Sequence, residues 1–182
     1  MFDDIKGKII GGVAVLVIGG TGFAVSQTDV ISNFAAETGM SQEEASKYVD
    51  SLKDEDLATF TEIGQDHIKE GNLTLKDSQS TDCVNYEYEW ESASLDCVTG
   101  KHQLETIGSS EVAMGECYLR LDEDLGNEAS NQINKCIKLI DTFTRSLELE
   151  VAVPYLSNEY VTEQKKTNAY NKSLLKASQD SE

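Results

Sequence analysis

The sequence has few basic residues for the number of its acidic ones. It carries 15 Lys and Arg against 33 Asp and Glu, which gives a formal net charge of −18. This shortage argues against a nucleic acid as partner, because binding to phosphates needs a basic face. It argues equally against lying on an anionic lipid surface. We expect a solvated acidic surface that keeps the protein soluble, and the alternative is a surface that binds cations or a basic partner.

The sequence also lacks the short motifs of common chemistries. It has no HExxH, no GxSxG, no complete P-loop and no CxxC, so neither a zinc site nor a redox dithiol is expected. Residues 122–126 resemble the start of a calcium loop, but the glycine comes one position early and the twelfth position has no glutamate. His67 is expected at the edge of the core, and Glu111 and Glu116 on helix surfaces. We therefore predict no catalytic residue, no cofactor and no bound metal.

One long uncharged run, Ile9 to Val25 (IIGGVAVLVIGGTGFAV), dominates the N-terminal part of the sequence. Its 17 residues reach the lower limit of the roughly 17 to 25 that a transmembrane helix needs. We expect a membrane anchor here. Gly12 and Gly20 would share one face of that helix, where small residues let a neighbouring membrane helix approach closely.

The placement of lysines orients this segment. Lys6 and Lys8 precede the run, and the next basic residue is Lys47. The positive-inside rule therefore places residues 1–8 in the cytoplasm as a short stub, and the remainder in the periplasm or outside the cell. A cleaved signal peptide is the alternative, with cleavage near Ser26 releasing a secreted or periplasmic protein.

The same run has a second interpretation. VAVLVIGGTGFAV (residues 13–25) resembles the first strand and phosphate loop of a Rossmann domain, and GGTGF (19–23) is similar to that loop in the extended short-chain dehydrogenases. This resemblance implies a nucleotide-binding enzyme in which the run is a buried strand. The family's motif continues to a further glycine where this chain has Val25, and the next segment is polar and helix-like. An enzyme is therefore the alternative to a non-catalytic module.

All four cysteines lie beyond the apolar run, at Cys83, Cys97, Cys117 and Cys136. An even number of cysteines in an exported chain predicts two disulfides, for which three pairings are available.

The strongest fold signal is in residues 109–147, which predict two antiparallel helices joined by a turn at Gly126. Apolar residues recur at helical spacing before the turn (Met114, Cys117, Tyr118, Leu121, Leu125) and after it (Ala129, Ile133, Cys136, Ile137, Ile140, Leu147). Cys117 lies nine residues before Gly126 and Cys136 ten residues after it. The hairpin brings the two cysteines level, which favours a bond between them.

Residues 110–141 resemble a single tetratricopeptide repeat. The matching positions on its two helices are Gly115, Tyr118, Ala129, Ile133 and Cys136. The resemblance implies a helical hairpin of a kind used in protein–protein binding. No copy occurs one period earlier or later, and repeat folds need about three units to bury a core. We therefore expect one repeat-like hairpin and not a solenoid.

Two further helices are predicted before the hairpin. Ser41 and Glu44 form a capping box for the first of them. Asp54 is positioned to cap the second, and Gly71 to end it, as glycine does at helix C-termini. Residues 26–40 are expected to form a polar neck.

Residues 83–107 and 147–153 fit two structures. Alternation of apolar and polar residues predicts a short antiparallel sheet, whereas apolar spacing on one face predicts helix. On one helix, Cys83 and Cys97 would lie about 21 Å apart along the axis and could not bond. In a hairpin they could.

We therefore predict a mainly α protein, with an α+β fold as the alternative. A transmembrane or signal helix is followed by a small disulfide-stapled helical domain over residues 41–176 and a disordered tail over 177–182. The expected function is a membrane-anchored or exported, non-catalytic interaction or structural module whose acidic surface binds a protein partner. A nucleotide-dependent enzyme and a cation-binding domain are the alternatives.

Overall fold

The computed structural model describes residues 26–52, 59–80, 83, 91–121, 123, 125–150 and 156–179. These ranges form the helices α1 (Gln27–Thr38), α2 (Gln42–Leu52), α3 (Phe60–Ser80), α4 (Glu91–Leu121), η3 (Gly126–Glu128), α5 (Ala129–Ser146) and α6 (Asn158–Gln179). The described ranges contain no strand, so the predicted mainly helical fold is confirmed. The alternative sheet is wrong over residues 91–107, because these residues lie within α4.

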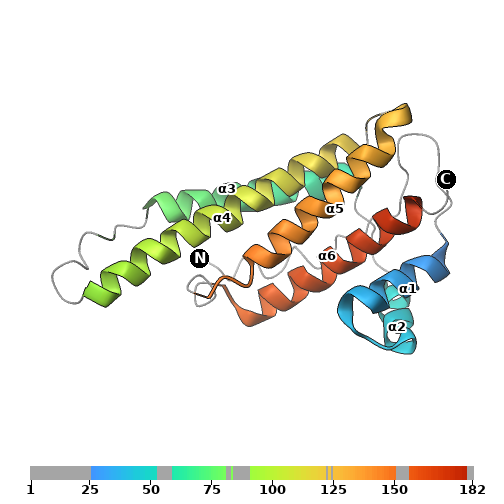
Figure 1. Cartoon of the computed structure of the whole chain (residues 1–182), viewed down its shortest axis with the longest axis horizontal. Coiled ribbons are helices and arrows are strands. Elements are labelled where there is room, and N and C mark those ends of the chain that lie inside the picture. The colour runs from blue at the N-terminus through green and yellow to red at the C-terminus, as the bar shows by residue number, and fades with distance from the viewer. Residues whose placement is uncertain are drawn as a thin grey trace.

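The helices pack in the order α3, α4, α5, α6, α1, α2, with each helix against the next (Figure 1). The long α3/α4 pair forms one side, and the short α1/α2 pair forms the other. From α3 to α6 this order follows the chain, and α1 then packs against α6, so the C-terminal helix joins the two parts of the core.

The close packing of α3 against α4 depends on glycine. A Cβ atom on Gly71 would lie 2.7 Å from the carbonyl oxygen of Gly108, and one on Gly64 would lie 2.7 Å from that of Gly115. Only glycine allows the two backbones to come this close. The expectation that Gly71 ends a helix is therefore wrong, because α3 continues through it to Ser80.

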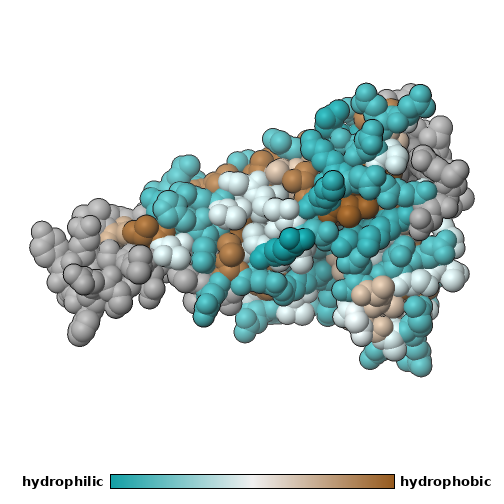
Figure 2. Space-filling view, viewed as in Figure 1, coloured by the Kyte–Doolittle hydropathy of each residue, from teal (hydrophilic) through white to brown (hydrophobic). Residues whose placement is uncertain are grey.

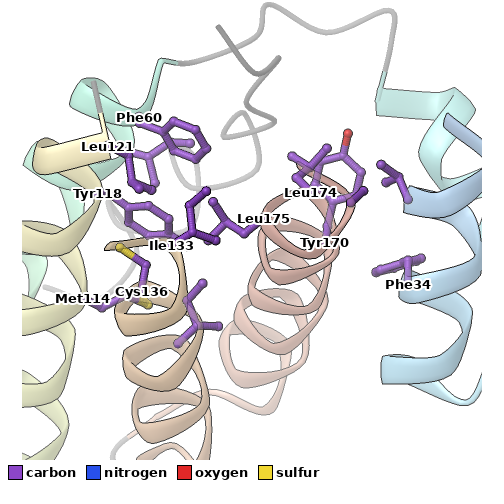
Figure 3. Close-up of a cluster of buried hydrophobic side chains, with 14 of the residues drawn as sticks. Phe34, Phe60, Met114, Tyr118, Leu121, Ile133, Cys136, Tyr170, Leu174 and Leu175 are labelled. Atoms are coloured by element: carbon purple, nitrogen blue, oxygen red, sulfur yellow. The ribbon is translucent and has the colours of Figure 1, made fainter. Parts of the chain in front are cut away.

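The α4/α5 hairpin and α3 enclose one half of the core. The rings of Phe60 and Tyr118 stack with centroids 5.7 Å apart, and Tyr118, Ile133 and Cys136 are almost completely buried. Figure 3 shows Leu175 of α6 pointing toward this group. The predicted helical hairpin is present, although its first helix is much longer than expected, because α4 begins at Glu91.

The segment expected to be a polar neck is helix α1, and its apolar face belongs to the core. Phe34 is fully buried, stacks on Tyr48 of α2 at 5.0 Å, and meets Tyr170 of α6 edge-on at 6.2 Å (Figure 3). Val30 and Ala35 are buried beside it. The prediction of a polar neck was wrong. The segment is mostly polar, but its few apolar residues recur at helical spacing and form one buried face.

Capping boxes start two of the helices. The Ser41 backbone N–H donates to Glu44 at 3.0 Å, and the Glu44 N–H donates to the Ser41 hydroxyl at 3.3 Å, as predicted. Thr59 and Glu62 make the same reciprocal pair at the start of α3. The sequence predicts Asp54 as the cap of this helix, and Asp54 lies outside the described residues.

Two predictions concern the chain ends. Residues 177–179 are not a disordered tail, because they continue α6 and Ala177 and Ser178 are buried. The cytoplasmic stub, the apolar run with Gly12 and Gly20, and the GGTGF motif lie outside the described residues. Within the described ranges, no helix is long and apolar enough to cross a membrane.

Candidate functional site

Two disulfides fasten the helices. Cys117 of α4 is joined to Cys136 of α5, with Cα atoms 5.5 Å apart, and both residues are buried. Cys83, which lies between α3 and α4, is joined to Cys97 of α4, with Cα atoms 5.7 Å apart, and both are half-buried. The second bond is possible because Cys83 lies outside the helix that carries Cys97. The predicted disulfide bonds are therefore present, and no described cysteine is free.

A buried amide accompanies the inner disulfide. The Gln132 Nε2 group lies 3.1 Å from the Cys117 sulfur and 3.4 Å from the Cys117 carbonyl oxygen, to which it donates. Gln132 is only 7% exposed, so solvent does not compete strongly for its amide. This contact links α4 to α5 beside the bond and fixes the hairpin further.

A cleft of about 420 Å³ opens between α1, α5 and α6. Its floor is partly apolar, with Met40, Ile140 and Ala169. Its charged lining consists of three acidic and three basic residues, namely Glu37, Asp141, Glu148, Lys165, Lys166 and Lys172. The cleft is therefore balanced in charge within a strongly acidic protein.

Ion pairs within this cleft hold the helices together. The Lys172 ammonium donates to Asp141 at 2.7 Å and to Glu37 at 2.8 Å, and Lys176 also donates to Glu37. Burial would raise the pKa of the Glu37 carboxyl, but the hydrogen bonds and charges of the two lysines outweigh it and hold that pKa below its usual value. Burial would likewise lower the pKa of Lys172, and its two carboxylates raise it instead. The charges in the cleft thus satisfy one another and tie α1 and α5 to α6.

A second titratable pair lies inside the bundle. His67 Nδ1 is 3.2 Å from Glu111 Oε1, and the two side chains are 8% and 1% exposed. Burial raises the pKa of the Glu111 carboxyl, an effect that the His67 contact opposes and the charge of Glu70 adds to. The prediction that Glu111 is a surface acid is therefore wrong, whereas Glu116 is exposed as expected.

The inner face of α6 is unusually polar. Gln164, Asn168 and Asn171 recur at helical spacing and are at most 1% exposed. Asn168 donates to the Thr144 hydroxyl of α5 at 3.0 Å. Its carbonyl oxygen and both amide atoms of Gln164 have no hydrogen-bond partner among the described residues. The Tyr118 hydroxyl and the Asn171 amide lie near each other but form no hydrogen bond of good geometry with a described residue. Buried polar groups without a partner reduce stability.

Charge is unevenly distributed over the helices. Together α5 and α6 hold seven of the 15 basic residues and three of the 33 acidic ones, a net charge of +4. The rest of the chain holds eight basic and 30 acidic residues, a net charge of −22. Figure 2 shows hydrophilic residues over much of the face that α5 crosses in Figure 1.

Sequence reasoning missed the buried pair and the cleft for different reasons. Glu111 falls on the same helical face as Ile107, Met114 and Tyr118, and that spacing was the available signal for its burial. In the cleft, Lys172 donates to Glu37, which lies 135 residues earlier in the chain. No local sequence pattern predicts such a contact. Within the described residues, no group of His, Cys, Asp and Glu is arranged to hold a metal ion.

No protein-family model matches the chain, and neither a curated protein nor a solved structure matches it.

Proposed function

We propose that the protein is a non-catalytic interaction module, exported and tethered to the membrane by its N-terminal apolar run, that presents an acidic helical surface to a protein partner. Two disulfides in a chain of this size carry the proposal. Stable disulfides persist in oxidising compartments and are rare in the cytosol, and both bonds here join separate segments of one helical body. Such bonds fit a domain that works outside the cytoplasm.

The role as an interaction module is supported by the way the body is built. The α3/α4 pair is closed at one end by the Cys83–Cys97 bond and is fastened to α5 by the Cys117–Cys136 bond. A surface on such cross-linked helices loses little conformational freedom on binding, which favours affinity. Five of the six charged groups of the cleft are paired with one another, and Lys166 pairs with Glu163 of the same helix. These charges therefore support the scaffold role better than a role in chemistry.

Part of the acidic surface lies on the α1/α2 side of the bundle. Helices α1 and α2 carry five acidic residues (Asp29, Glu37, Glu43, Glu44 and Asp50) and one basic residue, Lys47. An excess of one sign attracts partners of the opposite sign and raises their association rate. The partner is therefore expected to be a protein with a basic patch.

The test is chemical cross-linking on intact cells of the source. A membrane-impermeant, amine-reactive cross-linker is applied to cells that express the full chain with a C-terminal affinity tag. The proposal predicts cross-linked adducts of the tagged chain with a second polypeptide. A membrane-permeant reagent of the same length is the control. Adducts that form only with the permeant reagent, or no adduct with either, would overturn the proposal.

A further inference from the structure

Two Asn-X-Ser/Thr triplets, the acceptor motif for N-linked oligosaccharides, occur within the described helices. Residues 72–74 (Asn-Leu-Thr) lie inside α3, and residues 171–173 (Asn-Lys-Ser) lie inside α6. Each triplet has both the asparagine that accepts the sugar and the hydroxyl residue two positions later. The motif is therefore the same at the two places, but the surroundings of the two asparagines differ.

Asn72 lies on the outer side of α3. Its side chain is exposed and forms no hydrogen bond with a described residue. The preceding residue, Gly71, is buried against Gly108 of α4, and successive residues of a helix point about 100° apart around its axis. Asn72 is therefore turned away from the contact with α4. An oligosaccharide on Asn72 would extend into solvent without displacing another helix.

The chain around Asn72 is also open to an enzyme before the bundle forms. Gly71, Asn72 and Thr74 all favour helix weakly, so this part of α3 depends on its packing against α4. The glycine contact that secures the packing needs Gly108, which comes later in the chain. An enzyme that acts during export therefore meets residues 72–74 before α4 can cover α3.

Asn171 has the opposite surroundings. Asn171 and Ser173 are both 0% exposed, and Lys172 between them is held by ion pairs with Glu37 and Asp141. A closely packed interior has no room for a sugar on a fully buried amide. A chain modified at Asn171 could not dock α6 as the structure shows it, so the folded protein is expected to be unmodified there.

We propose that Asn72 of the exported chain carries an N-linked oligosaccharide and that Asn171 does not. This inference rests on the proposed function, since export brings the chain to the compartment in which such a transfer takes place. The donor is a lipid-linked oligosaccharide, joined through its anomeric carbon to a polyprenyl phosphate or diphosphate. The Asn72 Nδ2 atom bonds to that carbon while the carbon–oxygen bond breaks. The lipid phosphate leaves with the bonding electrons, and one amide proton passes to the transferring enzyme.

An oligosaccharide on α3 would also limit where a protein partner binds. The α3/α4 pair and the α1/α2 pair lie on opposite sides of the bundle (Figure 1). A bulky, solvated glycan on the α3 side obstructs a partner there. The acidic residues of α1 and α2 stay accessible, which is the side on which we place part of the acidic surface.

The experiment is peptide mass spectrometry on the full chain. The chain with a C-terminal affinity tag is expressed in cells of the source, purified from their membranes and digested with trypsin. Cleavage after lysine releases residues 70–76, which contain Asn72, and residues 167–172, which contain Asn171. We expect the first peptide to be heavier than its sequence by the mass of an oligosaccharide and to release sugar fragments on dissociation. The second peptide should have the mass of its sequence.

A matched pair of variants tests the motif. T74S and T74A both keep Asn72, but only T74S keeps the hydroxyl that the transferring enzyme needs. T74S should retain the added mass on residues 70–76, and T74A should lose it completely. The readout is the mass of a peptide, so it does not require either variant to fold. Chain from a host that transfers no oligosaccharide is unmodified, and substitutions near Asn72 then test the helix alone.

Three results would each overturn the inference: a wild-type Asn72 peptide found only at the mass of its sequence, an oligosaccharide on Asn171 of the folded protein, or an added mass that persists in T74A. The glycan and the proposed function fail separately. An unmodified Asn72 in a membrane-bound chain with both disulfides formed would remove the glycan and leave cross-linking to a second polypeptide untouched. A modified Asn72 without any cross-linked adduct would do the reverse.

Discussion

The contact between α3 and α4 makes a sharp prediction for Gly71. Replacing it with alanine adds a Cβ atom that would lie 2.7 Å from the Gly108 carbonyl oxygen and 2.8 Å from a methyl group of Val112. Ordinary contact begins near 3.4 Å, so the carbonyl is about 0.7 Å too close. A backbone carbonyl moves only with its helix, and therefore the whole α3/α4 contact must open.

The magnitude follows from two opposed effects. Overpacking of this kind costs about 2–3 kcal/mol when backbone must shift, and alanine in a helix interior gains about 1 kcal/mol over glycine. We expect G71A to lower the free energy of unfolding by about 1–2 kcal/mol. The control is N72A, at an exposed position of the same helix. It should raise the free energy of unfolding by about 0.5 kcal/mol, because alanine favours the helix more than asparagine does.

A double-mutant cycle tests the contact itself. A Cβ on Gly108 would lie 2.8 Å from the Gly71 carbonyl, so one substitution already opens the gap that the other needs. The loss in G71A/G108A should be smaller than the sum of the single losses by at least about 0.5 kcal/mol. Urea unfolding followed by far-UV circular dichroism measures all four proteins. If G71A were as stable as N72A, the close approach of the two backbones would be refuted.

Three further predictions concern bonds and charges. Replacing Cys117 and Cys136 together with serine should lower the free energy of unfolding by about 3 kcal/mol, because the bond closes a loop of 19 residues in the unfolded chain. Urea unfolding of the wild type and of this variant, both without reductant, measures the difference. A loss below about 1 kcal/mol would contradict the prediction. Because the pKa of Glu111 is raised in the folded state, its contribution to stability is present below about pH 4.5 and is lost as pH rises. Unfolding between pH 4 and 8 should therefore show wild type losing stability relative to E111Q as pH rises, and parallel curves would contradict the burial of this acid. The pKa of Glu37 is lowered, so its contribution is present above about pH 4.5 and is lost as pH falls. In the same assay, E37Q should accordingly lower the free energy of unfolding by less than about 1 kcal/mol at pH 7, and by progressively less as the pH falls below about 4.5.

The helical hairpin was predictable because its signals are local. Apolar residues at helical spacing flank Gly126, and the positions of Cys117 and Cys136 are set by their distance from that turn. The capping box at Ser41 is equally local. In each case, neighbouring residues determine the structure without help from the rest of the chain.

Gly71 shows where a local signal becomes ambiguous. Glycine marks both helix ends and close helix contacts, and the sequence interpretation chose the end. The decisive pattern was at long range: Gly64 and Gly71 are seven residues apart, and so are Gly108 and Gly115. On antiparallel helices this equal spacing brings Gly64 level with Gly115 and Gly71 level with Gly108. Gly71 considered alone does not indicate such a contact.

The candidate surfaces were less predictable than the fold. Net charge indicated an acidic molecule, but a total does not show that α5 and α6 together carry a net charge of +4. The spacing of Lys135, Lys138 and Arg145 was visible in the sequence. Only the structure showed that Asp141, the one acidic residue of α5, pairs with Lys172 of α6.

The most direct test of the proposed role is the state of the four cysteines in the cell. Intact cells are fractionated, and the thiols of the full chain are labelled before and after reduction. The account predicts that the chain is in the membrane fraction and that all four cysteines react only after reduction. A cytosolic chain with four thiols that react without reduction would contradict export, both disulfides and the interaction module built on them.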